Sequence, residues 1–256
     1  MEIPPMSQIV SEIKCPNCGA QLNVSPGELV ATCRYCGYTS VLGANAPFQL
    51  EHSLILNNFD QNRIVQDLQN WMRSGFMKPG DLAKKSKVTL LELRYLPFWL
   101  VPLTATSNYE GVIERISPPT QRKGTIQNDY DWLVLGRKGA EFPTRDYKVP
   151  SEGKIPFNFA KIESTAKFLN SEMDSNEAVQ HAKEEVEDNQ RFLLKQEVDQ
   201  VTKCDTTFNV EKPTYIHAPL WFIQYDYKGQ NYSAIIDGSS GSMIRGDIPH
   251  IDFKMI

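Results

Sequence analysis

Four of the five cysteines lie within the first 36 residues, in two C-x-x-C-G units. Cys15 and Cys18 belong to the first unit, and Cys33 and Cys36 belong to the second. Each unit can form a tight turn that directs two thiolates to one point, and the glycine that follows accepts the positive φ of such a turn. Two such turns supply the four sulfur ligands that Zn²⁺ prefers in structural sites. The pattern therefore predicts one bound Zn²⁺.

This spacing favours a closed zinc site over a pair of disulfides or a redox-active C-x-x-C. The chain starts Met-Glu-Ile-Pro-Pro, which lacks the basic and apolar regions of an export signal. We therefore expect a cytoplasmic protein, and disulfides are rare in that compartment. Four protein ligands leave no open position for a catalytic water, so the predicted zinc is structural. Its binding should fold the segment, with a free energy of about 10–16 kcal/mol.

No other set of residues has the spacing of a catalytic site. Cys204 stands alone and is expected to be a small apolar residue rather than a nucleophile. The turn Asp237-Gly238-Ser239-Ser240-Gly241 is one residue short of a nucleophile elbow, and P-loop and G-x-G-x-x-G motifs are absent. The four histidines show no ligand spacing with one another: His52, His181, His217 and His250. We expect a non-enzymatic protein without catalytic residues.

The composition describes an ordinary globular chain. Its 256 residues are 41% hydrophobic and 23% charged, with a net charge of −4. The pI is about 5.7, which argues against a general nucleic-acid binder, because such proteins usually carry a basic excess. No run approaches 18 apolar residues, so no membrane-spanning helix is predicted.

The cysteines are predicted to lie in an N-terminal zinc ribbon over residues 1–46, with rubredoxin-like knuckles. The turn Ser25-Pro26-Gly27-Glu28 lies between two short segments that we expect to be strands, 21–24 and 29–32. Residues 41–47 are expected to be a linker between the ribbon and the rest of the chain.

The rest of the chain is predicted to form two α+β units with antiparallel sheets, over residues 47–156 and 157–256. In the first unit, Asp60 can cap a helix that Gly75 ends. A strand with Pro97-Phe98-Trp99 follows.

The second unit repeats this order. A long helix is expected from about Asp174 to about Val201, followed by a strand with Pro219-Leu220-Trp221. The two P-x-W motifs are about 122 residues apart, which predicts a duplicated unit in an α+β protein.

Several side-chain sets have two interpretations. The P-x-W tryptophans are expected to be core anchors rather than a ligand-binding pair. Tyr225, Tyr227 and Tyr232 are expected to pack across strands, the alternative being a surface for single-stranded nucleic acid. Residues 60–94 carry seven basic and four acidic side chains, which leaves DNA or RNA binding open. The stretch 171–199 carries nine acidic and three basic residues and is expected to be solvated, a face for a basic partner being the alternative.

The ribbon resembles the zinc ribbon of transcription factor IIB and its prokaryotic relatives. Further motifs are similar to an uncharacterised family of prokaryotic zinc-ribbon proteins. These motifs are Trp71, Tyr95-Leu96-Pro97-Phe98-Trp99, Tyr109-Glu110-Gly111, Pro219-Leu220-Trp221, Tyr225-Asp226-Tyr227-Lys228-Gly229, Asp237-Gly238-Ser239-Ser240-Gly241 and Gly246-Asp247-Ile248-Pro249. Several relatives continue into transmembrane helices, and some are associated with phage-shock-type membrane stress, where they act as recruiting adaptors. This chain ends at Phe253-Lys254-Met255-Ile256, where such a tail would begin.

Two functional hypotheses follow. The first is a non-enzymatic zinc-binding scaffold or adaptor that binds protein partners. It would be cytoplasmic, and would associate with a membrane only indirectly or through a tail on the cytoplasmic side. The alternative is a nucleic-acid-associated factor, in transcription or on the ribosome, that uses the ribbon and the basic 60–94 region.

Overall fold

The computed structural model describes residues 13–42, 50–75, 77–139, 142, 145, 147–150 and 153–250. The fold class is α+β, as predicted. The strands are β1 (Val30–Thr32), β2 (Thr39–Val41), β3 (His52–Leu54), β4 (Lys87–Ile113), β5 (Thr120–Leu135), β6 (Ile155–Pro156), β7 (Lys167–Phe168), β8 (Gln200–Val210), β9 (Thr214–Tyr227), β10 (Gln230–Asp237) and β11 (Met243–Gly246). The helices are α1 (Gln61–Arg73), α2 (Leu82–Lys85) and α3 (Ser175–Leu194), with a 3-10 turn η1 (Phe159–Lys161). Most of the predicted linker and the C-terminal residues 251–256 lie outside the described residues.

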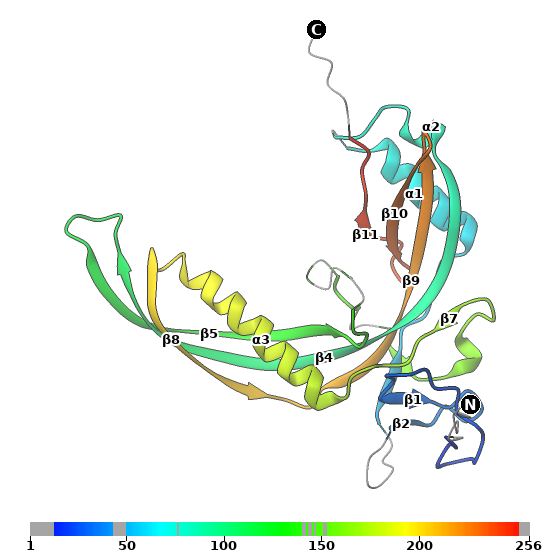
Figure 1. Cartoon of the computed structure of the whole chain (residues 1–256), viewed down its shortest axis with the longest axis horizontal. Helices are drawn as coiled ribbons and strands as arrows, with labels where there is room; N and C mark the ends of the chain where they lie inside the picture. The colour runs from blue at the N-terminus through cyan, green and yellow to red at the C-terminus, as the bar shows by residue number, and fades with distance from the viewer. Residues whose placement is uncertain are drawn as a thin grey trace, which may run out of the picture.

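A bent nine-stranded sheet, β3 to β11, organises the described part of the chain (Figure 1). Its central strand is β4, whose first half pairs with β9 and whose second half runs between β5 and β8. Strands β10 and β11 continue the sheet beyond β9. The result is two arms that meet where β4 and β9 pair, one carrying α1 and α2 and the other carrying α3 (Figure 1).

The prediction of a separate antiparallel sheet for each α+β unit is wrong. Strand β4, from residues 47–156, pairs with β8 and β9, from residues 157–256. The sheet is also mixed, because β3 pairs with β9 and β7 with β4 in parallel. The physical reason is length: the 27 residues of β4 span about 90 Å at roughly 3.3 Å per residue, so the strand continues from one arm into the other.

The pairing of the long strands supports the predicted duplication. Leu96 and Ala218 are 122 residues apart and lie directly opposite each other where β4 and β9 pair. A local two-fold axis through this pair relates the two arms. The short parallel strands obey the same relation. Lys167 of β7 lies opposite Arg94 of β4, and Ser53 of β3 lies opposite Ile216 of β9, which is 122 positions after Arg94.

Two glycines repeat the same close contact. The N–H of Gly136 donates to the carbonyl of Pro97, and the N–H of Gly238 donates to the carbonyl of Pro219, both at 2.8 Å. A Cβ at either glycine would lie 2.6 Å from a side-chain oxygen of the segment that precedes the nearby helix. Both positions therefore require glycine for space, and each P-x-W proline anchors the end of a neighbouring strand.

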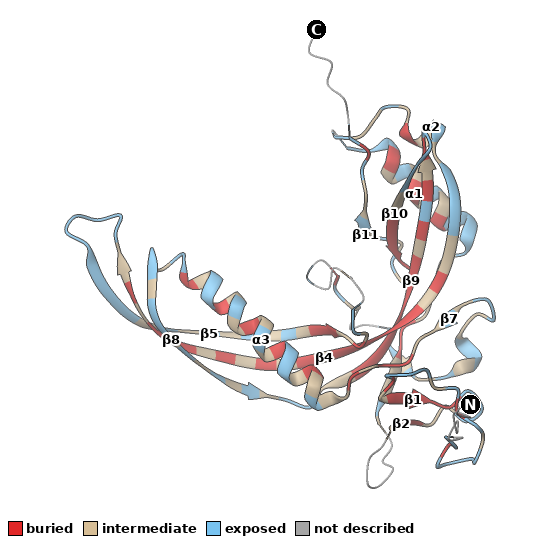
Figure 2. Ribbon diagram, viewed as in Figure 1, coloured by how far each residue is buried: buried red, intermediate tan, exposed pale blue. Residues whose placement is uncertain are grey.

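The helices begin where the sequence predicts. The carboxylate of Asp60 accepts the N–H of Arg63 at the start of α1, and Asp174 caps α3 in the same way. Helix α3 ends at Leu194, earlier than the predicted end near Val201. The chain leaves the helix there, and Val198 packs against Gly111 of β4. Figure 2 shows the buried residues of the sheet gathered where the arms meet, with the outer ends exposed.

The aromatic residues pack as predicted. Trp99 and Trp221 are 0% and 3% exposed, so both are core anchors. Tyr225 and Tyr232 lie opposite each other on β9 and β10, and their rings stack at 5.6 Å.

The strands of the ribbon differ from the expectation. The Ser25–Glu28 turn is present, since the N–H of Glu28 donates to the carbonyl of Ser25 at 3.1 Å. However, β1 pairs with β2 around the second cysteine turn, and only Gln21 of the expected strand 21–24 forms a bridge, to Lys14. The cysteine turn closes the hairpin locally, and the backbone before β1 is left free to contact the body of the protein.

Candidate metal centre

The four predicted ligands converge at one point. All four Sγ atoms lie within 4.8 Å of one another. The Sγ atoms of Cys15 and Cys36 are 3.6 Å apart, and those of Cys18 and Cys33 are 3.7 Å apart. Sulfurs at the corners of a ZnS₄ tetrahedron, with Zn–S near 2.3 Å, are about 3.8 Å apart. The cluster therefore fits a tetrahedral metal ion.

The two knuckles have the same local geometry. The N–H of Gly19 donates to the carbonyl of Cys15, and the N–H of Gly37 donates to the carbonyl of Cys33, both at 2.9 Å. The two glycines have φ values of +74° and +73°, which side chains with a Cβ adopt only with strain. The predicted turn at each C-x-x-C-G unit is therefore present, with the glycine as part of the turn.

The two exposed thiols, Cys18 and Cys36, have pKa values shifted in opposite directions. Burial opposes ionisation of Cys36, but hydrogen bonds from the Tyr38 backbone and the Asn17 side chain lower its pKa to about 6. The Ala20 backbone favours the thiolate of Cys18, yet the neighbouring thiols and burial together raise its pKa to about 12. A bound divalent cation would attract the negative sulfurs and hold all four of them as thiolates.

The ribbon is fixed to the body through β1. The N–H groups of Leu29 and Val30 donate to the carbonyl of Ser171, at 2.8 and 3.1 Å. The side chain of Val30 is fully buried and belongs to the same core as Trp99 and Tyr215. Backbone pairing and apolar burial thus hold the cysteine cluster at a fixed place on the bent sheet.

A buried ion pair reinforces this attachment. Glu28, which is 9% exposed, accepts from Asn170 at 3.0 Å and from Arg137 at 3.3 Å. Arg137 also forms an ion pair with Glu172 at 2.9 Å. Asn170 completes the contact by accepting the N–H of Thr32 at 3.2 Å.

A chain of hydrogen bonds links the ribbon to two histidines. Nε2 of His217 lies 2.7 Å from the carbonyl of Leu169, which can only accept, so this nitrogen carries the hydrogen. Nδ1 of His217 then accepts from Nε2 of His52, at 2.7 Å. Nδ1 of His52 in turn accepts from the hydroxyl of Thr39, at 2.9 Å, and Thr39 accepts from Thr32, at 3.0 Å. We call this chain the histidine relay.

The relay requires both histidines to be neutral. Burial lowers the pKa of His52 well below 6.5, and the neighbouring His217 lowers it further. Burial also lowers the pKa of His217 to about 3, although its hydrogen bond to Leu169 opposes this. The rings stack on Phe157 and Phe168, with centroids 4.0 and 4.1 Å apart. A second proton on His217 would place its Nδ1–H directly against the Nε2–H of His52.

Sequence reasoning missed this pair because His52 and His217 are 165 residues apart and no spacing connects them. The other singled-out residues lie elsewhere. Cys204 is partly buried on β8, beside Thr206. The hydroxyls of Ser239 and Ser240 donate to Asp237 and close a turn.

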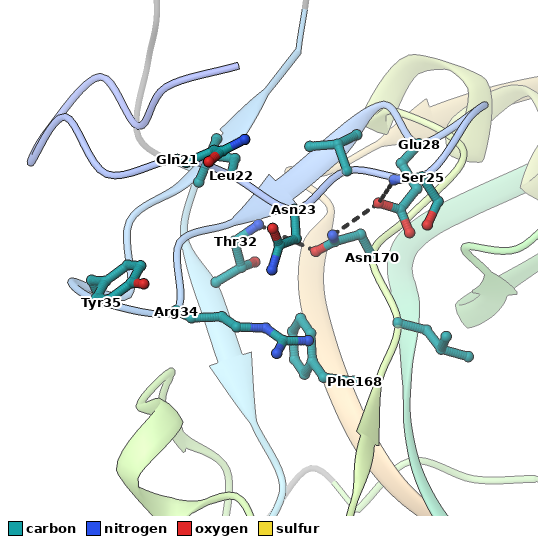
Figure 3. Close-up of a pocket in the computed structure, with 12 residues that line it drawn as sticks. Gln21, Leu22, Asn23, Ser25, Glu28, Thr32, Arg34, Tyr35, Phe168 and Asn170 are labelled. Carbon is teal, nitrogen blue, oxygen red and sulfur yellow. Dashed lines mark hydrogen bonds between the residues drawn. The ribbon is translucent and has the colours of Figure 1, made fainter. Parts of the chain in front are cut away.

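The tip of the second knuckle is exposed. Tyr35 is 80% exposed, and Arg34 is also exposed. A groove of about 530 Å³ lies on one side, between the ribbon and the 168–170 segment. Arg34 and Phe168 both line this groove, and Figure 3 shows Tyr35 apart from the other labelled side chains. Polar side chains line the groove: Gln21, Asn23, Ser25, Thr32 and Asn170.

A second groove, of about 860 Å³, lies on the other side of the same knuckle. Apolar side chains contribute to its lining: Ile155, Pro156, Phe157 and Phe159. Arg34 and Tyr35 line both grooves, so the knuckle tip projects between a polar and an aromatic depression.

The basic 60–94 region presents fewer free charges than its count implies. Arg63 pairs with Asp67 at 3.2 Å, and Lys85 pairs with Asp81 at 2.7 Å. Two more cations of this region are engaged, since Arg94 pairs with Glu92 and Lys78 lies over the ring of Trp71. Lys167, from β7, also pairs with Glu92. Phosphate binding depends on free cations, so these pairs weaken the case for nucleic acid.

Among the helices of the described residues, none has the length and apolar character needed to cross a membrane. Comparisons with family models, curated proteins and solved structures give no match to this chain.

Proposed function

We propose that this protein is a non-enzymatic adaptor whose zinc-stabilised ribbon presents Arg34 and Tyr35 to a protein partner. The observation that carries the proposal is the exposed knuckle tip between two grooves, on a ribbon that is fixed to a large sheet. Tyrosine and arginine are enriched among residues that dominate binding energies at protein interfaces. A rigid platform also avoids the entropic cost of ordering the binding site.

The lining of the grooves indicates the chemistry of the partner. The aromatic groove, with Phe157 and Phe159, suits apolar side chains. The polar groove and the guanidinium of Arg34 suit a carboxylate and backbone amides. We therefore expect a partner segment that combines apolar residues with at least one acidic residue. Recruitment to a membrane, which the family resemblance implies, would then be a property of this partner.

The metal in this proposal is Zn²⁺, held by Cys15, Cys18, Cys33 and Cys36. Its role is structural: it closes the two knuckles and sets the direction of Arg34 and Tyr35. Four sulfur ligands suit Zn²⁺ better than hard cations such as Mg²⁺ or Ca²⁺, which prefer oxygen.

A photoreactive phenylalanine analogue in place of Tyr35 is expected to form one dominant covalent adduct with a protein in the native cell. Arg34→Glu in the same chain should remove the adduct, because it reverses the charge that faces the carboxylate. The measurement is gel analysis of the cross-linked protein followed by mass spectrometry. The same analogue at Phe192, which is 62% exposed on α3, is the matched control. Equal adducts from both positions would contradict the proposal.

Salt-dependent binding separates the adaptor from the alternative of a nucleic-acid-associated factor. We expect only weak binding of DNA or RNA near physiological salt, because the net charge is −4 and several cations of residues 60–94 are paired. Fluorescence anisotropy with labelled duplex DNA and single-stranded RNA is the measurement. Micromolar or tighter binding that falls steeply as salt rises would favour the alternative.

A further inference from the structure

Strand β5 presents a long open edge. It has 16 residues and pairs with β4 along its whole length. No other strand of the described residues pairs with its second edge. Figure 1 shows β5 along the margin of the arm that carries α3. An unpaired edge of this length is a ready template for another strand.

The side chains of β5 are self-complementary around Ile126. On the face away from α3, Lys123 and Thr125 precede this residue, and Gln127 and Asp129 follow it. In an antiparallel pair of two identical strands centred on Ile126, position 123 lies opposite 129 and position 125 opposite 127. Lys123 of each copy would therefore face Asp129 of the other, which is a stabilising cross-strand pair.

We propose that two copies of this chain pair through β5, antiparallel, with the two-fold axis at Ile126. The pairing would join the β8-β4-β5 arms of both copies into one continuous sheet. A two-fold symmetric contact of one surface with itself is the commonest arrangement in homodimers. This inference does not depend on the proposed adaptor function, because it uses none of the residues of the knuckle tip.

In the single chain, the contacts of Lys123 and Asp129 are compatible with this pairing. Lys123 pairs with Glu110 at 2.9 Å, but its side chain is 68% exposed. Asp129 accepts a hydrogen bond from Thr104 at 2.7 Å, and no ion pair to it is formed within the described residues. In the dimer, each Lys123 would lie between its own Glu110 and the Asp129 of the second copy.

The face that carries α3 fits the same register. Ile126 would lie opposite Ile126, which matches apolar with apolar, and Arg122 would lie opposite Tyr130. A shift of the axis by one residue, to Gln127, would instead place Ile126 opposite Asn128. The side chains of this face are held by α3, because Asn128 donates to Gln190 at 3.0 Å and Tyr130 accepts from Asn189 at 3.2 Å. The edge is thus preorganised for pairing.

A charge exchange tests the register. Lys123→Asp and Asp129→Lys, made singly, each place like charges opposite each other twice in the dimer. Each is expected to raise the dissociation constant of the dimer about 10- to 30-fold. The double variant restores opposite charges and should return the constant to within about threefold of the original. Sedimentation equilibrium of the full-length zinc-loaded protein is the measurement, and circular dichroism checks that each variant is folded.

Lys203→Asp is the matched control. It makes the same change of charge on β8, at the other edge of the same arm, where Lys203 already pairs with Asp205 at 2.9 Å. We expect this variant to dimerise like the original protein. Three results would overturn the proposal: a protein that is monomeric at tens of micromolar, a dimer that Lys203→Asp weakens instead, or a double variant that dimerises no better than the single ones.

Discussion

Removal of the metal is expected to unfold the ribbon and leave the bent sheet folded. The ribbon has only a small core of its own, in which Cys15 and Cys33 are themselves buried members. Without the metal, these two core residues would no longer be tied to Cys18 and Cys36 through a shared ion. Metal binding contributes about 10–16 kcal/mol in comparable segments, which is more than a core of this size can replace. Among the described residues the sheet has four separate cores, to which the ribbon contributes only Val30 and the partly buried Val41.

Amide hydrogen exchange measures this effect region by region. In the Cys15→Ser/Cys33→Ser variant, protection should be lost over residues 13–42 and kept over β4, β9 and β10. Tryptophan fluorescence should shift to longer wavelength, because detachment of Val30 would expose Trp99.

The control for this experiment is Cys204→Ser. Cys204 lies on β8 beside Tyr109 and Val201, in a different core, so its replacement should keep one metal ion per chain. Metal retained by the Cys15→Ser/Cys33→Ser variant would contradict the assignment of these ligands. Loss of protection across the entire sheet would contradict the independence of the ribbon.

Acidification below pH 6.5 is expected to destabilise the protein through the histidine relay. The pKa values of His52 and His217 are lowered in the fold, so the unfolded chain binds more protons than the native one. The stabilisation is therefore complete above pH 6.5 and is lost as the pH falls toward about 3. At pH 5.5 the loss for His217 is about 1.4 kcal/mol. His52, whose pKa is also held well below 6.5 by burial and by His217, adds to this loss.

Urea unfolding at pH 7.5, 6.5 and 5.5 measures this slope. Acid also protonates zinc-bound thiolates, so a variant is needed to separate the two effects. His52→Gln keeps a donor toward Nδ1 of His217 and an acceptor for Thr39, but it cannot titrate. We expect the variant to be less sensitive to pH than the original protein, with the zinc contribution unchanged. An identical dependence on pH in both proteins would show that the relay does not control acid stability.

The cluster of four cysteines could be predicted from sequence because its determinants are local. Two C-x-x-C-G turns specify ligand type, ligand number and backbone conformation within five residues each. The same holds for the starts of α1 and α3, where Asp60 and Asp174 cap the helix that follows. Such features depend on neighbours in the chain, so a single sequence contains them.

The joining of the two units could not be predicted in this way. The P-x-W repeat indicated a duplication, but it did not indicate that β4 and β9 would pair around Leu96 and Ala218. That pairing depends on contacts more than 100 residues apart. The histidine relay also depends on contacts between distant parts of the chain, because His52 and His217 meet only when β3 lies beside β9.

The metal site and the relay together explain how a small ribbon becomes a fixed platform. In the proposed account a bound metal ion folds the knuckles, and β1, Glu28 and the relay attach them to the sheet. Arg34 and Tyr35 are then held at one place relative to both grooves. Loss of the metal should therefore abolish partner binding as effectively as loss of Tyr35.

X-ray absorption spectroscopy at the zinc edge, on the protein as purified from its native cell, tests the central claim most directly. The account predicts one zinc per chain with four sulfur ligands at about 2.3 Å and no lighter ligand. A nitrogen or oxygen ligand in the first coordination sphere, or a metal-free protein with oxidised Cys15, Cys18, Cys33 and Cys36, would contradict it.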